Sequence, residues 1–133
     1  MPTYLLDTNI LSDLIRNPAG KVAVEIAEVG EDQIVTSIIV AAELRYGAAK
    51  RASPRLTAQV EAVLSGFEIL PLQTPVDFLY GKIRAQLQRT GKTNSANDLL
   101  IAAHALSLSA ILVTGNTGEF EQVDGLKVEN WLG

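Results

Sequence analysis

The chain contains no cysteine, and its 133 residues include a single histidine, His104. The absence of cysteine excludes disulfides, thiolate zinc sites and cysteine nucleophiles, and it fits a reducing compartment. One histidine is too few for the paired histidines that most zinc hydrolases need. Any metal ion bound here must therefore be held mainly by oxygen ligands, which favours Mg²⁺, with Mn²⁺ as a substitute.

Long apolar runs are also missing, because none approaches the roughly 20 residues of a membrane-spanning helix. The first residues do not place a basic segment before an apolar one, as a secretory signal would. We therefore expect a cytoplasmic protein with no membrane partner. Hydrophobic residues make up 47% of the sequence, so residues 1–133 are expected to form one domain with a substantial core.

Basic residues are outnumbered, since 11 lysines and arginines stand against 15 acids, which gives a net charge of −4. This net charge argues against nucleic-acid binding, but the distribution of charge argues for it. The segments 44–60 and 78–97 contain no acid and hold 8 of the 11 basic residues. The candidate phosphate contacts in these segments are Arg45, Lys50, Lys82, Arg84 and Arg89. The alternative interpretation is two ordinary solvated helix faces, and the sequence alone leaves both open.

Short apolar and β-branched runs alternate with longer segments of helical periodicity. The patterns predict strands at 4–6, 33–37, 68–70 and 110–113, and an edge strand at 127–129. They predict helices at 10–16, 21–29, 40–49, 56–64, 76–88 and 96–108, and a short turn or helix at 116–120. Strands separated by such helices pair in parallel through right-handed crossovers. The expected fold is therefore α/β: a three-layer α/β/α domain around a mostly parallel sheet of four to five strands.

Three acids stand at positions that ordinary surface residues rarely occupy. Asp7 ends the first apolar strand, Asp98 precedes a segment too apolar for a surface helix, and Glu43 lies within a helix. Each has a structural alternative. Asp7 and Asp98 are placed where a helix cap would stand, and Glu43 could be a surface residue paired with Arg45 or Lys50.

The order of strands and helices brings these three acids to the same carboxyl edge of the sheet, where open α/β folds build their sites. Carboxylates gathered there would repel one another at neutral pH unless a cation bound between them. The sequence therefore predicts a divalent-metal site formed by Asp7, Glu43 and Asp98.

Four short motifs follow one another in order along nearly the whole chain. They are LDTN at 6–9, AEL at 42–44, ND at 97–98 and VTGNTGEF at 113–120. Together these motifs resemble those of PIN-domain ribonucleases, and in particular those of the VapC toxins of bacterial toxin–antitoxin pairs. Each motif is short, but four in register are specific.

The resemblance implies an Mg²⁺-dependent endoribonuclease that hydrolyses phosphodiester bonds in structured RNA, with tRNA ahead of rRNA. It implies a cognate VapB-like antitoxin as inhibitor, a homodimer, and a higher toxin–antitoxin assembly. Operator DNA would be contacted only through the antitoxin. For the acids it implies that Asp7 and Asp98 are the primary metal ligands, while Glu43 holds a water bound to the metal or acts as a base.

Four further residues receive supporting roles from the same resemblance. Thr8 and Thr114 would orient water or phosphate. Many PIN domains carry a fourth acid directly after the last core strand, where this chain has Asn116. The fourth position of the site therefore falls to Asn116, to Glu119 or to water. Separately, His104 is expected to be structural.

Two other classes of protein remain to be distinguished. A receiver-like module would also hold Mg²⁺ in an acid pocket, but it needs an Asp on the third strand and a Lys after the last. This chain has Glu68-Ile69-Leu70 on the third strand and no such Lys after the fourth. A purely structural partner that sequesters another protein would have no use for clustered acids. Metal-dependent cleavage of RNA, abolished by EDTA, would separate the nuclease from both.

Overall fold

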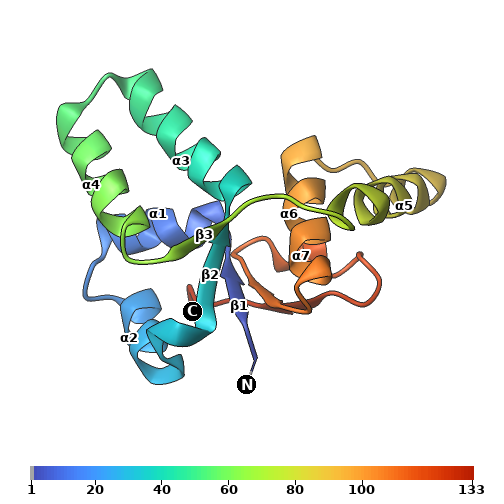
Figure 1. The fold of residues 1–133 in the computed structure, drawn as a ribbon, viewed down its shortest axis with the longest axis horizontal. Coiled ribbons are helices and arrows are strands. Elements are labelled where there is room, and N and C mark those ends of the chain that lie inside the picture. The colour runs from blue at the N-terminus through green and yellow to red at the C-terminus, as the bar shows by residue number, and fades with distance from the viewer. Residues whose placement is uncertain (1) are drawn as a thin grey trace.

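A parallel sheet forms the centre of the computed structural model, which describes residues 2–133 (Figure 1). Its strands are β1 Tyr4–Leu6, β2 Ile34–Ser37, β3 Glu68–Leu70, β4 Ile111–Val113 and β5 Lys127–Glu129. They lie in the order β3-β2-β1-β4-β5, and every pairing is parallel. The predicted α/β/α class is confirmed, and the edge strand predicted at 127–129 is part of the sheet.

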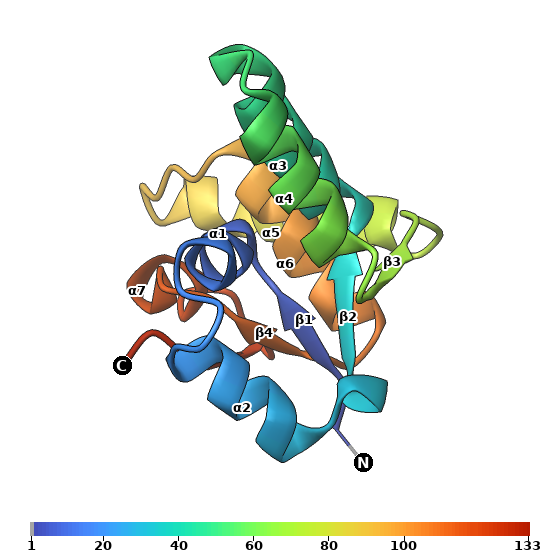
Figure 2. The ribbon, with the colours of Figure 1, turned by 90° about the vertical axis from the view of Figure 1, so that its left-hand side faces the viewer.

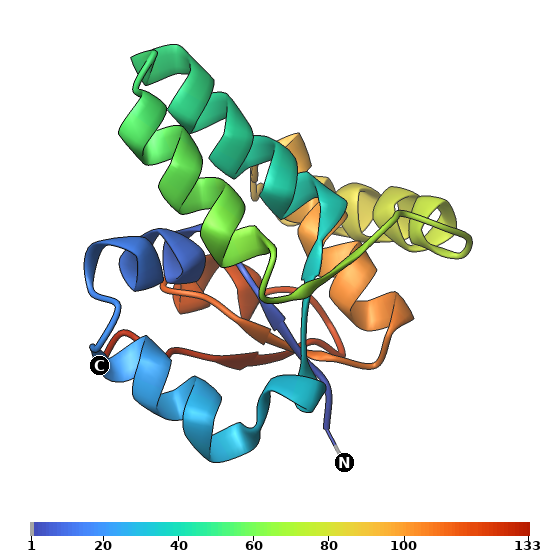
Figure 3. The same cartoon turned by 60° about the vertical axis from the view of Figure 1, so that its left-hand side comes forward.

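Helices cover the sheet and extend beyond it. They are α1 Thr8–Arg16, α2 Lys21–Val29, α3 Ile38–Arg51, α4 Pro54–Leu64, α5 Val76–Arg89, α6 Ala96–Ser107 and α7 Thr117–Phe120, with a 3-10 turn, η1, at Glu31–Gln33. Figures 1 and 3 show α3 and α4 as a hairpin on one side of the molecule, with α5 reaching out on the other. None of the helices between residues 2 and 133 is long and apolar enough to cross a membrane.

Several helices begin earlier than the apolar periodicity indicates, because polar side chains cap them. Ser37 accepts a hydrogen bond from the Ile39 N–H, so α3 starts at Ile38 rather than at residue 40. Ser53 caps α4 in the same way, with Pro54 in the first turn. A capping side chain satisfies N–H groups that have no partner inside the helix. The helices are therefore those that the sequence predicts, but they begin a few residues earlier than predicted.

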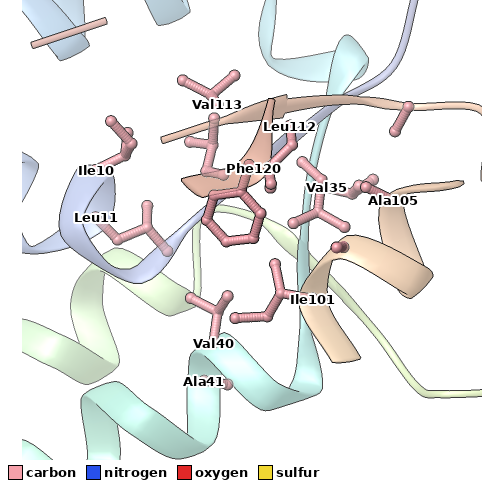
Figure 4. Close-up of a cluster of buried hydrophobic side chains, with 14 of the residues drawn as sticks. Ile10, Leu11, Val35, Val40, Ala41, Ile101, Ala105, Leu112, Val113 and Phe120 are labelled. Atoms are coloured by element: carbon pink, nitrogen blue, oxygen red, sulfur yellow. The ribbon is translucent and has the colours of Figure 1, made fainter. Parts of the chain in front are cut away.

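The core lies between the sheet and the helices packed on it. Leu5 and Leu6 of β1 and Leu112 and Val113 of β4 are completely buried, as expected for strands covered on both faces. Figure 4 shows side chains from several elements meeting in this core: Ile10, Leu11, Val35, Val40, Ala41, Ile101, Ala105 and Phe120. Burial of these apolar side chains holds α1, α3 and α6 against the sheet.

The strand register determines which polar residues meet at the carboxyl edge. Leu6 of β1 is the partner of Thr36 in β2 and of Val113 in β4. The next residue of each segment is Asp7, Ser37 or Thr114, and all three are buried. The Asp7 N–H donates to the Val113 carbonyl at 2.9 Å, which extends the pairing by one residue. In Figure 2 the strands end beneath α1, α3 and α6, the helices that carry the candidate site.

Candidate metal centre at the carboxyl edge of the sheet

Asp7 stands where β1 ends and α1 begins, and it is only 3% exposed. Its Oδ1 accepts from the Thr8 backbone N–H at 2.8 Å, and its Oδ2 accepts from the Thr114 hydroxyl at 2.8 Å. The pKa of Asp7 is raised from 3.8 to about 6, with burial as the largest cause. The two hydrogen bonds oppose this rise, and the charges of Asp98 and Glu43 add to it. Asp7 does cap α1, but a buried acid that faces other acids is more than a cap.

Glu43 is half-buried on α3 and faces the end of β1. The Thr8 hydroxyl donates a short hydrogen bond to its Oε1, and the Asn97 side-chain amide donates to its Oε2 at 3.4 Å. The surface interpretation of Glu43 is not supported, because the only ion pair in residues 2–133 joins Arg45 to Glu61. Glu43 is instead held by two neutral groups, which leaves its negative charge uncompensated.

Asp98 lies in the first turn of α6, but its side chain is not the helix cap. The Ser95 hydroxyl takes that role by accepting from the Asp98 backbone N–H at 3.1 Å. The pKa of Asp98 is raised, mainly by burial and further by the charges of Glu119 and Glu43, while a hydrogen bond from the Ser95 side chain opposes the rise. The carboxylate of Asp98 is therefore not the cap of α6, which was the structural alternative that the sequence offered.

Asp7, Glu43 and Asp98 line one open pocket of about 410 Å³. The other residues of its wall are Thr8, Asn9, Ser12, Arg16 and Asn116. Three carboxylates from three separate segments thus meet in one pocket. Repulsion adds to the burial that raises the pKa values of Asp7 and Asp98, since Asp98 and Glu43 act on Asp7, and Glu43 acts on Asp98 together with Glu119. The three acids that the sequence predicts to converge therefore lie together in the structure.

Residues 4–126 match the family model of the PIN domain. This chain belongs to the PIN-domain family. It is 41% identical to a protein named ribonuclease VapC of Haemophilus influenzae, over 99% of this chain and 100% of the relative. It is 37% identical to the tRNA(fMet)-specific endonuclease VapC of Shigella flexneri, over 98% of this chain and 99% of the relative. Identities of this size over the full length place it in the VapC branch of the family.

The fold of this PIN domain also matches solved structures of VapC proteins. The chain superposes on one from a DNA-bound VapBC complex of Salmonella typhimurium with a TM-score of 0.91 and 35% identity. The match covers 98% of this chain and 99% of the other. The resemblance drawn from the four sequence motifs is therefore confirmed at the level of both sequence and fold.

The donor set of this PIN pocket fits a hard divalent cation. No three acidic or histidine side chains within residues 2–133 are arranged to ligate one ion directly. Mg²⁺ keeps several of its waters and is commonly bound through one or two protein carboxylates, so it does not require three. Asp7 and Asp98 supply carboxylates whose ionised forms are disfavoured without a counter-charge. A cation between them would relieve that cost.

The four supporting residues occupy different positions relative to the pocket. Thr8 lines the wall and holds Glu43 through its hydroxyl. Thr114 is fully buried beneath the pocket and bonds Asp7, while its own hydroxyl accepts from the Asn116 N–H at 3.0 Å. Asn116 lines the wall, whereas Glu119 is exposed and reaches the site through its charge on Asp98. The two threonines thus position carboxylates in this structure.

Sequence reasoning missed three residues of the pocket wall: Asn9, Ser12 and Arg16. Thr8, Ser12 and Arg16 are spaced four apart, and residues at that spacing share one face of a helix. The signal was therefore present in the sequence of α1. Asn9 does not share this spacing. Its Oδ1 accepts from the Gly115 N–H at 3.0 Å, and helical periodicity gives no sign of a contact across 106 positions of the chain.

The five predicted phosphate contacts fall into two groups. Lys82, Arg84 and Arg89 are exposed on α5, where Arg84 donates to the Tyr80 hydroxyl at 2.7 Å. Arg45 and Lys50 are exposed on α3, but Arg45 forms a two-pronged ion pair with Glu61 at 2.9 Å. Glu61 lies just outside the acid-free segment, and the packing of α4 on α3 brings it next to Arg45. The charge of Arg45 is thus already partnered within the hairpin.

Proposed function

We propose that this chain is a metal-dependent endoribonuclease and the toxin of a toxin–antitoxin pair. The observation that carries the proposal is the meeting of Asp7, Glu43 and Asp98 in one pocket at the carboxyl edge of the sheet. The proposal is supported by the names of the relatives, which are ribonucleases and endonucleases. Cytoplasmic action fits an RNA substrate and a chain without cysteine.

Asp7 and Asp98 would hold Mg²⁺, with Mn²⁺ as a substitute, because both offer hard oxygen donors. When bound, the cation neutralises phosphate charge and lowers the pKa of a water molecule. Glu43 would accept the proton of the attacking water, since its carboxylate faces the pocket and carries no ion pair. Thr8 orients Glu43 and Thr114 orients Asp7, so both acids are held before substrate arrives.

The substrate we propose is structured RNA, with tRNA ahead of rRNA. The relative from Shigella flexneri is named as specific for tRNA(fMet) and shares 37% of its residues with this chain. Lys82, Arg84 and Arg89 are exposed on α5 and Lys50 is exposed on α3, and Figure 1 shows these two helices reaching out on opposite sides of the sheet. Cations spaced in this way would bind the phosphates of a folded RNA whose backbone passes the pocket.

The proposed inhibitor is a VapB-like antitoxin, because the structural match comes from a VapBC complex. A groove of about 290 Å³ between α1, α3 and α4 has apolar walls that include Ile15, Leu44, Leu56 and Val60. Thr8, Ser12, Arg16 and Glu43 line both this groove and the acid pocket. An antitoxin segment with apolar side chains in the groove could reach the acids with a basic one. We also propose a homodimer, a higher assembly with the antitoxin, and operator contacts made through the antitoxin.

The decisive experiment is RNA cleavage by the purified protein with Mg²⁺, with Mn²⁺ and with EDTA. Cleavage should require a divalent ion and should be lost in Asp98→Asn. Asp32→Asn is the matched control, because Asp32 lies in η1 at the amino end of β2, far from the pocket. Cleavage that persists in EDTA, or in Asp98→Asn, would refute the proposal. Sequencing the 5′ ends of the fragments would identify the RNA.

A further inference from the structure

His104 is the only histidine in the chain, and its side chain is 2% exposed within α6. Its Nδ1 lies 2.8 Å from the Oγ of Ser37, which is itself completely buried. The two residues are 67 positions apart in the sequence. A buried imidazole bonded to a buried hydroxyl is a specific contact, because an unpartnered polar group in the core is costly.

The other contact of Ser37 bears on the direction of this hydrogen bond. The Ser37 Oγ already accepts from the Ile39 N–H at 3.1 Å, as the cap of α3. A serine hydroxyl has one proton to donate, and the His104 Nδ1 accepts it when the imidazole carries its own proton on Nε2. In that tautomer a directed chain runs from the Ile39 amide through Ser37 to His104, in which each bond strengthens the next.

Ser37 and His104 hold corresponding places on the two helices that carry site acids. Glu43 follows Ser37 by six residues on α3, and Asp98 precedes His104 by six residues on α6. Six helical residues span about 9 Å. Because α3 rises from the sheet while α6 descends toward it (Figure 1), this one bond near the sheet relates Glu43, partway along α3, to Asp98 in the first turn of α6. The contact between Asn97 and Glu43 joins the helices again at the pocket.

The apolar contacts between α3 and α6 define the relative position of the two helices less well than the Ser37–His104 hydrogen bond does. Val40 and Ala41 of α3 and Ile101 and Ala105 of α6 belong to the same buried cluster (Figure 4). Apolar attraction is non-directional and scales with buried area. Small side chains such as alanine allow a helix to shift along its neighbour with little loss of area. A hydrogen bond between two buried polar atoms permits no such shift.

We propose that His104 is a positioning residue, which acts through the Ser37 cap to fix α3 against α6 and so sets the separation of Glu43 and Asp98. This role rests on the proposed metal-dependent nuclease, because it assigns a purpose to the spacing of two acids of that site. His104 touches neither substrate nor metal in this scheme. Its loss should weaken the metal site and slow cleavage without changing how RNA is bound.

The first test reads the hydrogen-bond chain directly and does not depend on activity. A protein labelled with ¹⁵N-histidine gives signals from His104 alone, since the chain has no other histidine. Long-range proton–nitrogen correlation at neutral pH should show the tautomer protonated on Nε2 in the wild type. In Ser37→Ala that preference should weaken. A wild-type imidazole protonated on Nδ1 would overturn the proposal.

The second test measures Mn²⁺ affinity by calorimetry in the full-length protein. His104→Leu removes the acceptor and should weaken Mn²⁺ binding about tenfold, the size typical of losing a residue that orients a metal ligand. His104→Asn should restore most of the affinity, because its Oδ1 occupies the place of Nδ1 and accepts from Ser37. Val40→Ala is the matched control, because it destabilises the same interface without touching a polar contact.

The outcomes separate the two proposals. Equal Mn²⁺ affinity in wild type and His104→Leu, or equal losses in His104→Leu and Val40→Ala, would overturn the positioning role and leave the nuclease standing. In active variants the loss should fall on kcat, with KM for RNA unchanged. A wild-type protein that neither binds Mn²⁺ nor cleaves RNA would refute the nuclease, and with it the purpose assigned to His104.

Discussion

The Asp7 carboxyl group is almost fully buried, yet the proposed metal site needs it ionised. Its folded-state pKa of about 6 exceeds the ordinary 3.8, so the folded protein holds this proton more tightly than the unfolded chain. Without metal, the free energy of unfolding should therefore fall as the pH rises from about 4 to about 6, by up to about 3 kcal/mol. Above that range the cost is constant.

Asp7→Asn removes this cost and is nearly isosteric, so the metal-free variant should be more stable than the wild type at pH 7.5. The difference should vanish below about pH 3, where Asp7 is protonated in both the folded and the unfolded state. Urea unfolding in EDTA across this pH range measures it. A variant that is less stable than the wild type at every pH would show that the Asp7 charge is compensated within the protein.

Asp98→Asn tests the same electrostatics at a half-buried position. Removing one of several mutually repelling acids should raise the melting temperature of the metal-free protein by a few degrees. The variant should also gain less stability from Mg²⁺, because ligand binding stabilises only a native state that has the site. Thermal melts with EDTA and with Mg²⁺ provide the measurement. Unchanged melting and an unchanged Mg²⁺ response would make Asp98 a residue of the helix turn only.

At the scale of the element, α5 carries three of the five predicted phosphate contacts, Lys82, Arg84 and Arg89, and all three are exposed. Reversing Lys82 and Arg89 together, to Glu, should weaken binding of every RNA sequence and flatten the dependence of affinity on salt. The measurement is affinity at several salt concentrations, with the inactive Asp98→Asn background preventing cleavage. Arg45→Glu is a useful comparison, because Arg45 is already paired with Glu61. Unchanged affinity in the double reversal would identify α5 as a solvated face.

The elements themselves were largely predictable from the sequence, and so were the acids. One apolar run ends on Asp7, and another follows Asp98 in α6. Both acids mark the carboxyl edge of the sheet, because a charged residue is rarely placed inside a buried segment and lies at its end instead. The contacts that orient those acids were not predictable. The Thr8–Glu43, Ser37–His104 and Arg45–Glu61 contacts each join residues far apart in sequence. They depend on how two helices pack, and local periodicity carries no information on that.

At the scale of the whole molecule, the acid pocket and the apolar groove form one continuous surface. An antitoxin that places a basic side chain among the acids should bind more weakly when Asp7 and Asp98 are both changed to Asn. Calorimetry with the cognate antitoxin measures this. Undiminished affinity would confine the inhibitory contact to the groove, where Leu56→Asp, at a partly exposed position of the groove wall, should then abolish it.

The position of β1 in the sheet has a consequence for synthesis. Its neighbours are β2 and β4, and β4 is made more than a hundred residues after β1. Asp7 obtains its Thr114 hydrogen bond only then. A growing chain therefore has no assembled acid pocket. In the proposed nuclease, cleavage of RNA therefore has to wait until β4 and Thr114 have joined β1.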